Sequence, residues 1–213
     1  MENGLTGRRG RLKSFFVCVK RFQITIDAVS QALLAICGGI NKKYQKCDIK
    51  NEKAQEDARL VLYLLDALEE SGIYERPVIV ICPGGGYQYL SDREAEIVAM
   101  QFAAMGYHAA VLHYSVSPAV FPTALLEMGK AVALLRQNGK KWNIDTDKIV
   151  VLGFSAGGHL AASYGMFWSR EWVCEKLGVR SELLRPDGMI LCYPVISSGE
   201  FAHQESFRRL LGN

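Results

Sequence analysis

The segment Gly153-Phe154-Ser155-Ala156-Gly157 places a serine between two glycines with one residue on either side. This G-x-S-x-G pattern is typical of a sharp strand-to-helix turn, in which the neighbouring chain passes too close for a Cβ at the flanking positions. The turn pushes the serine Oγ out over the edge of a sheet, and the helix behind it favours developing negative charge at the Ala156 N–H. The pattern therefore predicts Ser155 as a nucleophile. The alternative is an ordinary glycine-rich turn.

A second glycine cluster, Pro83-Gly84-Gly85-Gly86-Tyr87, also follows an apolar run. Consecutive glycines let peptide N–H groups turn toward an oxygen that carries charge in a tetrahedral intermediate, where one such donor contributes about 2.7–4 kcal/mol. We predict Gly85 and Gly86, together with Ala156, as donors to this oxyanion. The alternatives are a tight turn and a phosphate-binding loop; neither G-x-x-x-x-G-K-[ST] nor G-x-G-x-x-G is present to support the latter.

The elements that must position these residues follow from the alternation of apolar runs and helical patterns after residue 58. Strands are predicted at residues 77–82, 108–113, 148–152 and 189–193, and helices at 91–105, 122–138 and 156–166. Such alternation indicates a parallel sheet covered on both faces. Right-handed crossovers then place the loops after successive strands along one edge of the sheet.

The segment Ser91-Asp92-Arg93-Glu94 reads as a capping box at the start of the first of these helices. In that arrangement the Ser91 hydroxyl and the Glu94 carboxylate satisfy free N–H groups of the first turn. Arg93, which follows the glycine loop, is a candidate to contact a substrate or an element covering the pocket.

Composition indicates a globular chain of 213 residues, 49% apolar and 22% charged, with residues 56–213 as the main domain and residues 1–55 as an extension of unknown role. The net charge of +3 arises partly from the basic start, so no nucleic-acid partner is expected. The six cysteines form no C-x-x-C pair or Cys/His cluster, which disfavours a metal site and a disulfide framework. No cofactor, no membrane association and a cytoplasmic location are expected.

Several segments together resemble the bacterial α/β-hydrolases of the acetyl-esterase or acetyl-xylan-esterase-like group, relatives of hormone-sensitive-lipase-type esterases and prolyl oligopeptidases. The resemblance covers roughly residues 58–213, and the segments that carry it are 82–87, 91–96, 106–108, 143–147, 153–160 and 193–199. It implies an α/β-hydrolase fold, with a mostly parallel sheet and helices on both faces. Pro83 stands where many relatives have a histidine before the glycines, a change that keeps the backbone donors.

The resemblance also implies a catalytic triad in the order Ser, Asp, His, with the acid and base on loops after later strands. Nothing before Asn213 corresponds to those loops. We therefore expect the triad Asp and His, and the C-terminal strands of the fold, to be missing from this sequence, and a central strand to be left unpaired on one side.

The remaining histidines and acids fit structural or pocket-lining positions. His159 lies one turn along the helix after Ser155, and we expect its side chain to run into packing. His203 and Tyr87, like Arg93, are candidates for the pocket wall. Structural roles are expected for the other histidines and for the acids before the last two strands: His108, His113, Asp145, Asp147 and Asp187.

The leading functional hypothesis is a serine carboxylic-ester hydrolase that acts on short acyl esters, including acetyl groups on sugars, through an acyl-enzyme on Ser155. Its partner would be a small-molecule ester. One alternative is a catalytically incomplete chain or a binding remnant of such a hydrolase. Another is a peptidase of the prolyl oligopeptidase type, which shares the serine motif.

Overall fold

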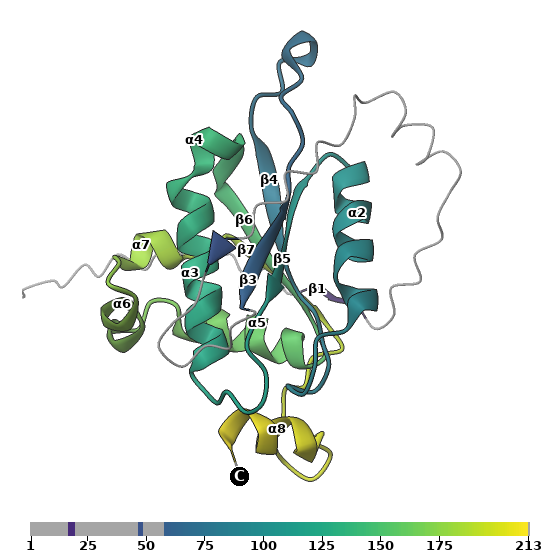
Figure 1. Cartoon of the computed structure of the whole chain (residues 1–213), viewed down its shortest axis with the longest axis vertical. Coiled ribbons are helices and arrows are strands. Elements are labelled where there is room, and N and C mark those ends of the chain that lie inside the picture. The colour runs from purple at the N-terminus through teal and green to yellow at the C-terminus, as the bar shows by residue number, and fades with distance from the viewer. Residues whose placement is uncertain (1–16, 20–46, 49–57, 213) are drawn as a thin grey trace, which may run out of the picture.

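The strands that the structure describes form one seven-stranded sheet in the order β1-β7-β6-β4-β5-β3-β2 (Figure 1). The structure is a computed structural model that describes residues 17–19, 47–48 and 58–212. The sequence also predicts one helix-like stretch in the extension, at residues 28–36, which lies outside the described residues. The strands are β1 (Val17–Val19), β2 (Cys47–Asp48), β3 (Arg59–Tyr63), β4 (Arg76–Cys82), β5 (His108–His113), β6 (Ile144–Phe154) and β7 (Gly188–Cys192).

The central strand β4 pairs in parallel with β6 on one side and β5 on the other. Its run from Val78 to Ile81 is buried throughout, because helices cover both faces of the sheet and neither face can carry polar side chains. β6 and β7 continue the parallel pairing, whereas β3 runs antiparallel to β5. The mostly parallel sheet predicted from the sequence is thus present, with an antiparallel edge.

Helices cover both faces of the sheet and the ends of its strands. Figure 1 shows α2 on one side and α3 on the other, with α8 beyond the carboxyl ends of the strands. The helices and 3-10 turns are η1 (Glu69–Ser71), η2 (Asp92–Glu94), α2 (Glu96–Ala104), α3 (Thr123–Gln137), α4 (Gly139–Trp142), α5 (Ala156–Phe167), α6 (Glu171–Leu177), α7 (Ser181–Leu184) and α8 (Gln204–Leu211). None of the helices in the part of the chain that the structure describes combines the length and the apolar character needed to cross a membrane.

The predicted strands and the helices α3 and α5 agree with the structure to within a few residues. The apolar stripe of α3, with Leu125, Met128, Val132 and Leu135, is fully or almost fully buried against the sheet. Helices α6, α7 and α8 had no counterpart in the prediction, because each is short and lacks a long periodic apolar pattern.

The predicted capping box at Ser91 is wrong. Residues 92–94 form the separate turn η2, α2 begins only at Glu96, and no side chain caps either start. The Glu94 carboxylate accepts hydrogen bonds from Gly84 N and from the Tyr193 hydroxyl instead. Two tertiary donors thus occupy the oxygens that a local cap would have used.

The prediction of an unpaired central strand is also wrong for the described chain. The outer side of β7 pairs in parallel with β1, with Val17 opposite Ile190 and Val19 opposite Cys192. An open strand presents a row of free N–H and C=O groups that favours the addition of another strand. Both β1 and β2 come from residues 1–55, so this segment extends the sheet at each edge, while the domain boundary near residue 55 stays a prediction.

Asp187, at the start of β7, is structural as expected. Its carboxylate accepts hydrogen bonds from Arg136 Nη2 at 2.7 Å and from Ile149 N at 3.1 Å, and a further ion pair comes from the more exposed Arg185. The side chains of Arg136 and Asp187 are only 12% and 10% exposed. This pair joins α3 to the amino-terminal side of the sheet, opposite the edge where Ser155 lies.

We expect Asp187→Ala to lower the free energy of unfolding by about 3 kcal/mol or more, because it removes the carboxylate that balances the charge of the mostly buried Arg136 guanidinium. Urea unfolding monitored by circular dichroism measures this. The matched control is Asp145→Ala, which removes an ion pair with the exposed Lys148 and should change the midpoint little. Equal midpoints for the two variants would contradict the structural role of Asp187.

Candidate active site

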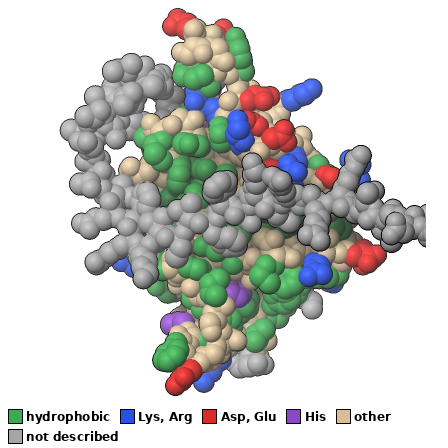
Figure 2. Space-filling view, turned by 180° about the vertical axis from the view of Figure 1, so that it is seen from behind, with side chains coloured by type: hydrophobic (Ala, Val, Ile, Leu, Met, Phe, Trp, Pro, Cys, Tyr) green, Lys and Arg blue, Asp and Glu red, His purple; other side chains and the backbone are tan. Residues whose placement is uncertain are grey.

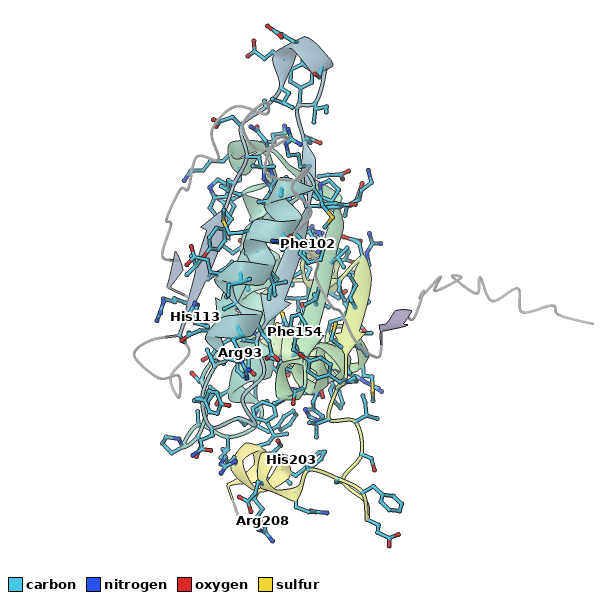
Figure 3. All side chains as sticks on the ribbon, turned by 90° about the vertical axis from the view of Figure 1, so that its right-hand side faces the viewer. Arg93, Phe102, His113, Phe154, His203 and Arg208 are labelled. Carbon is cyan, nitrogen blue, oxygen red and sulfur yellow. The ribbon has the colours of Figure 1, made fainter. Side chains whose placement is uncertain are left out.

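The loops after three neighbouring strands begin at the same edge of the sheet. Cys82 at the end of β4 lies opposite Gly153, and Cys192 at the end of β7 lies opposite Phe154. The glycine loop, Ser155 and the segment after Cys192 are therefore brought together, as the predicted crossover geometry requires. In Figure 3, Phe154 and Arg93 lie just below the middle of the molecule, and His203 lies further toward its lower end.

Ser155 itself has φ 50° and ψ −114°, a conformation that non-glycine residues rarely adopt. Such a residue costs about 1–3 kcal/mol and persists only where its surroundings hold it. Its N–H donates to Cys192 O at 3.0 Å, and its carbonyl accepts from His159 N at 3.0 Å and Val195 N at 3.1 Å. The turn is thus held both by its own helix and by the chain after β7.

The flanking glycines have no room for a side chain. A Cβ on Gly153 would lie 2.1 Å from Gly157 O, and a Cβ on Gly157 would lie 2.1 Å from Cys82 O and 2.5 Å from Pro83 O. All of these neighbours are backbone atoms, which cannot rotate away. The crowding expected from the G-x-S-x-G pattern is therefore present, and it joins the first turn of α5 to the end of β4.

The glycine loop passes directly over the serine. A Cβ on Gly84 would lie 2.9 Å from Phe154 O and 3.1 Å from Ser155 Cβ. Gly85 and Gly86 then take φ values of 130° and 63°, which glycine adopts without strain. Tyr87 follows in the left-handed region at φ 57°.

The peptide N–H groups around Ser155 differ in their availability. Gly84 N donates to Glu94 Oε2 at 2.8 Å and is therefore occupied. Within residues 58–212, the N–H groups of Gly85, Gly86 and Ala156 donate to no acceptor. These three are the amides that the sequence singled out as oxyanion donors, a role that stays a prediction.

Two functional candidates in this region escaped the sequence reasoning. Glu94 was assigned to a cap, yet its second oxygen accepts from the Tyr193 hydroxyl at 2.7 Å, and Tyr193 was taken only as the end of a strand. Burial, followed by the nearby Glu94 carboxylate, raises the pKa of the Tyr193 phenol. The only feature of the sequence that could have indicated this role of Glu94 is the position of an acidic residue shortly after the glycine loop.

Tyr87 and His159 form a hydrogen-bonded pair beside the loop. The Tyr87 hydroxyl lies 2.8 Å from His159 Nδ1, and the His159 ring also contacts Phe207 of α8 edge to face, with centroids 5.4 Å apart. Burial lowers the pKa of His159 and raises that of Tyr87. His159 is thus packed as expected, and Tyr87 is buried against it.

The other pocket candidates occupy different surroundings. His203 precedes α8, where its Nδ1 lies 2.8 Å from Ser206 Oγ, and its Cε1 lies 3.8 Å from the place of a Cβ on Gly86. It therefore lies beside the glycine loop. Arg93 is exposed on η2, close enough to Tyr193 for its charge to lower the phenol pKa slightly against the larger effect of burial.

The last two histidines lie on β5. His108 is buried, accepts from Leu65 N at Nδ1 and donates from Nε2 to Asn143 O, which is the structural role expected of it. His113 borders a hollow between β3 and α2. Residues 58–212 contain all four histidines, and no hydrogen bond joins any of their rings to the Ser155 hydroxyl. The absence of the triad acid and base from the sequence stays a prediction.

An open groove of about 510 Å³ lies between α5, α8 and the loop before α3. His159 and Ser163 of α5, Phe121, and Gln204 and Arg208 of α8 line it. Figure 2 shows histidine side chains among apolar ones at the lower end of the molecule, where α8 lies. Over the described residues, no three His, Cys, Asp or Glu side chains gather as metal ligands.

Comparison with known proteins finds similar chains of several kinds. The BD-FAE family model matches residues 65–178, just over half of the chain. Endo-1,4-β-xylanase B of Butyrivibrio fibrisolvens is 37% identical over 144 residues, which cover 65% of this chain and 22% of that protein. An acetylxylan esterase of Xylanibacter ruminicola is 32% identical over 138 residues, covering 63% of this chain and 26% of the relative.

Solved structures are similar as well. An acetyl ester-xyloside bifunctional hydrolase from Caldicellulosiruptor lactoaceticus is 40% identical with a TM-score of 0.65, over 81% of this chain and 61% of that one. MGS-M1, an α/β hydrolase enzyme from a Medee basin deep-sea metagenome library, is 39% identical with a TM-score of 0.60, over 74% and 59% of the two chains. The chain spans only about a quarter of the length of the xylanase and of the acetylxylan esterase that it matches, 22% and 26% respectively.

We expect Gly157→Ala to lower the free energy of unfolding by about 3 kcal/mol or more, because the added methyl group meets two backbone carbonyls that cannot move without separating α5 from β4. Gly199→Ala is the matched control. Its nearest neighbour would be the Ser197 hydroxyl at 3.3 Å on an exposed loop, so a change within about 0.5 kcal/mol is expected. Urea unfolding of both variants measures the two free energies of unfolding. A similar loss of stability in Gly157→Ala and Gly199→Ala would contradict the crowding at Gly157.

His159 should titrate below 6.5, its ordinary pKa, because burial disfavours the charged ring. The unfolded state then binds the proton more readily, so stability falls as the pH is lowered through about 6.5. NMR titration of the ring protons measures the pKa, and urea unfolding at neutral and acidic pH measures the linkage. Tyr87→Phe should keep the pKa low, since burial is the cause; a midpoint at or above 6.5 in the wild type would contradict this.

Proposed function

The chain belongs to the BD-FAE family of α/β hydrolases, and on that premise we propose that it is a serine carboxylic-ester hydrolase that acts through an acyl-enzyme on Ser155. Membership follows from the family match over more than half of the chain. The α/β-hydrolase fold predicted from the sequence is confirmed by its similarity to the two solved structures.

The observation that carries the proposal is the conformation of Ser155 beneath the glycine loop. A strained serine at a helix start, with Gly84 packed against its side chain, is the arrangement that an acyl-transfer nucleophile needs. In the proposed reaction, Ser155 Oγ forms a bond to the ester carbonyl carbon, and the N–H groups of Gly85, Gly86 and Ala156 stabilise the negative oxygen. The bond to the alcohol then breaks, and the alcohol leaves with a proton.

The second half of the proposed reaction returns the serine. Water attacks the acyl carbonyl, the same amides stabilise the second tetrahedral intermediate, and the carboxylic acid is released. A histidine oriented by a carboxylate normally removes and returns the protons. That pair is the part of the machinery that the resemblance places after the described strands.

For the substrate we propose short acyl esters, including acetyl groups on sugars. The support is the printed names of relatives: an acetylxylan esterase and an acetyl ester-xyloside bifunctional hydrolase. The groove beside α5 offers apolar Phe121 and Phe207 together with polar Gln204 and Arg208, a mixture that suits the alcohol part of a sugar ester.

A second candidate function is a binding module of this fold without turnover. It is favoured by one observation: among the described residues, no histidine ring hydrogen-bonds the Ser155 hydroxyl, and the rings of His108, His159 and His203 have other partners. Such a chain would keep the oxyanion amides and the serine, and it would bind an ester or its acid without cleaving it.

If the proposed function holds for this chain, it hydrolyses p-nitrophenyl acetate, and Ser155→Ala lowers kcat by at least about 10³-fold because the covalent step is lost. Such turnover would mean that a histidine within the 213 residues, or one from a second copy, acts as the base, and the expectation of a missing triad would then be wrong. Acetate should be preferred to an octanoate ester. Circular dichroism must show that both proteins are folded. Turnover that is equal in the two proteins would overturn the role of Ser155, and no turnover by a folded wild type would favour the binding module.

A further inference from the structure

We propose that Glu94 is a positioning residue for the oxyanion loop, in which its carboxylate links the loop after β4 to the loop after β7 and sets the height of the glycines over Ser155. This inference rests on the proposed function. One oxygen accepts from Gly84 N at 2.8 Å and the other from the Tyr193 hydroxyl at 2.7 Å. Both carboxylate oxygens are therefore used, each by a donor from a different loop.

The link spans the strand that carries the serine. In the sheet β6 lies between β4 and β7, and Ser155 follows β6 directly. Gly84 belongs to the loop after β4, and Tyr193 is the first residue after β7. Glu94, from η2, thus connects the two loops that border the serine on either side.

Gly84 is held at both of its backbone polar groups. Its N–H donates to Glu94, and its carbonyl accepts from Ser91 N at 3.0 Å. A Cβ at this position would lie 2.7 Å from Glu94 Oε2 and 3.1 Å from Ser155 Cβ, so the peptide is confined between the carboxylate and the serine. The Gly85 N–H shares its peptide with Gly84 O, so the bond from Ser91 N together with the Glu94 bond one peptide earlier restricts the direction of that N–H. The Gly86 N–H shares its peptide with Gly85 O, which accepts from Gln88 N and Tyr89 N.

The Tyr193 end of the link is anchored too. Tyr193 has φ 37°, an unusual value for a bulky residue, and its ring lies 5.9 Å from that of Phe154, centroid to centroid. Such a conformation persists where contacts hold it, and the hydroxyl bond to Glu94 supplies one of them. Tyr193 as a whole is 49% exposed, so the packing of its ring holds it only in part.

The negative charge of Glu94 lies close to the predicted oxyanion site, so the direction of its hydrogen bonds affects the transition state. A carboxylate near a developing oxyanion raises the energy of the transition state, and hydrogen bonds from donors to the carboxylate oxygens offset part of that repulsion. Here one donor is the peptide directly before the predicted oxyanion donors. Accepting from Gly84 N also removes that N–H from the candidate donors, which leaves Gly85 and Gly86 to face the substrate.

The test is amide hydrogen exchange at Gly84, measured by NMR on the 213-residue chain, which needs no turnover. Glu94→Ala should speed exchange of the Gly84 amide by about 10-fold or more, since a hydrogen bond to a charged acceptor is lost. Glu94→Gln should change it by less than about 3-fold, because the amide oxygen still accepts from Gly84 and the NH₂ group donates to Tyr193. The control is Glu175→Ala on α6, an exposed carboxylate without a partner among the described residues.

A kinetic measurement separates positioning from general stability. With p-nitrophenyl acetate, Glu94→Ala should lower kcat about 10- to 100-fold with little change in KM, and Glu94→Gln should restore most of it. Tyr193→Phe, which keeps the Gly84 bond, should have a smaller effect on both readouts. Unchanged exchange at Gly84 in Glu94→Ala, or equal losses of kcat in the Ala and Gln variants, would overturn the proposal.

The two proposals can fail separately. If the wild type shows no Ser155-dependent turnover, the proposed function fails, and the exchange data still decide whether Glu94 holds the loop. If turnover is present and exchange at Gly84 is unaffected by Glu94→Ala, only the positioning role fails.

Discussion

The close approach of backbone to backbone at Gly157 is the contact on which the candidate site depends. The first turn of α5 lies so near the carbonyls of Cys82 and Pro83 that no Cβ fits between them. This contact brings the end of β4 and the start of α5 together, and it thereby puts the glycine loop over Ser155. A bulkier residue at 157 would separate the two loops by the width of a methyl group, and the amides would no longer surround one point.

The strain of this arrangement is offset by hydrogen bonds from several directions. Ser155, Tyr87 and Tyr193 all take positive φ values, and each has a fixed partner: Ser155 through Cys192 O, Tyr87 through His159, and Tyr193 through Glu94. The Tyr114 hydroxyl donates to Pro83 O at 2.6 Å from beneath the glycine loop. At this edge of the sheet, several residues with unusual backbone conformations are therefore each held in place by hydrogen bonds to their neighbours.

A buried carboxylate supports the same edge from further back. Glu127 of α3 is fully buried and accepts from both the backbone N–H and the hydroxyl of Ser115, which follows β5. Burial raises the pKa of Glu127, against the opposing effect of those two bonds. The loop after β5 thus owes its position to two hydrogen bonds from Ser115 to a carboxyl group inside the core, much as the loop after β4 owes its position to Glu94.

The sequence by itself determined the parallel sheet, the strand-to-helix turn at Ser155 and the glycine loop. Local periodicity and the steric needs of glycine are written in short stretches of residues, and α3 even buries the four apolar residues that its pattern singles out. Only the tertiary structure decided what depends on residues far apart in the chain: β1 beside β7, the helix α8 beside the loop, and the change of Glu94 from a helix cap to a link between Gly84 and Tyr193. The reason is that a carboxylate binds whichever donors the folded chain brings nearest, and Tyr193, 99 positions away from Glu94, leaves no mark in the local pattern.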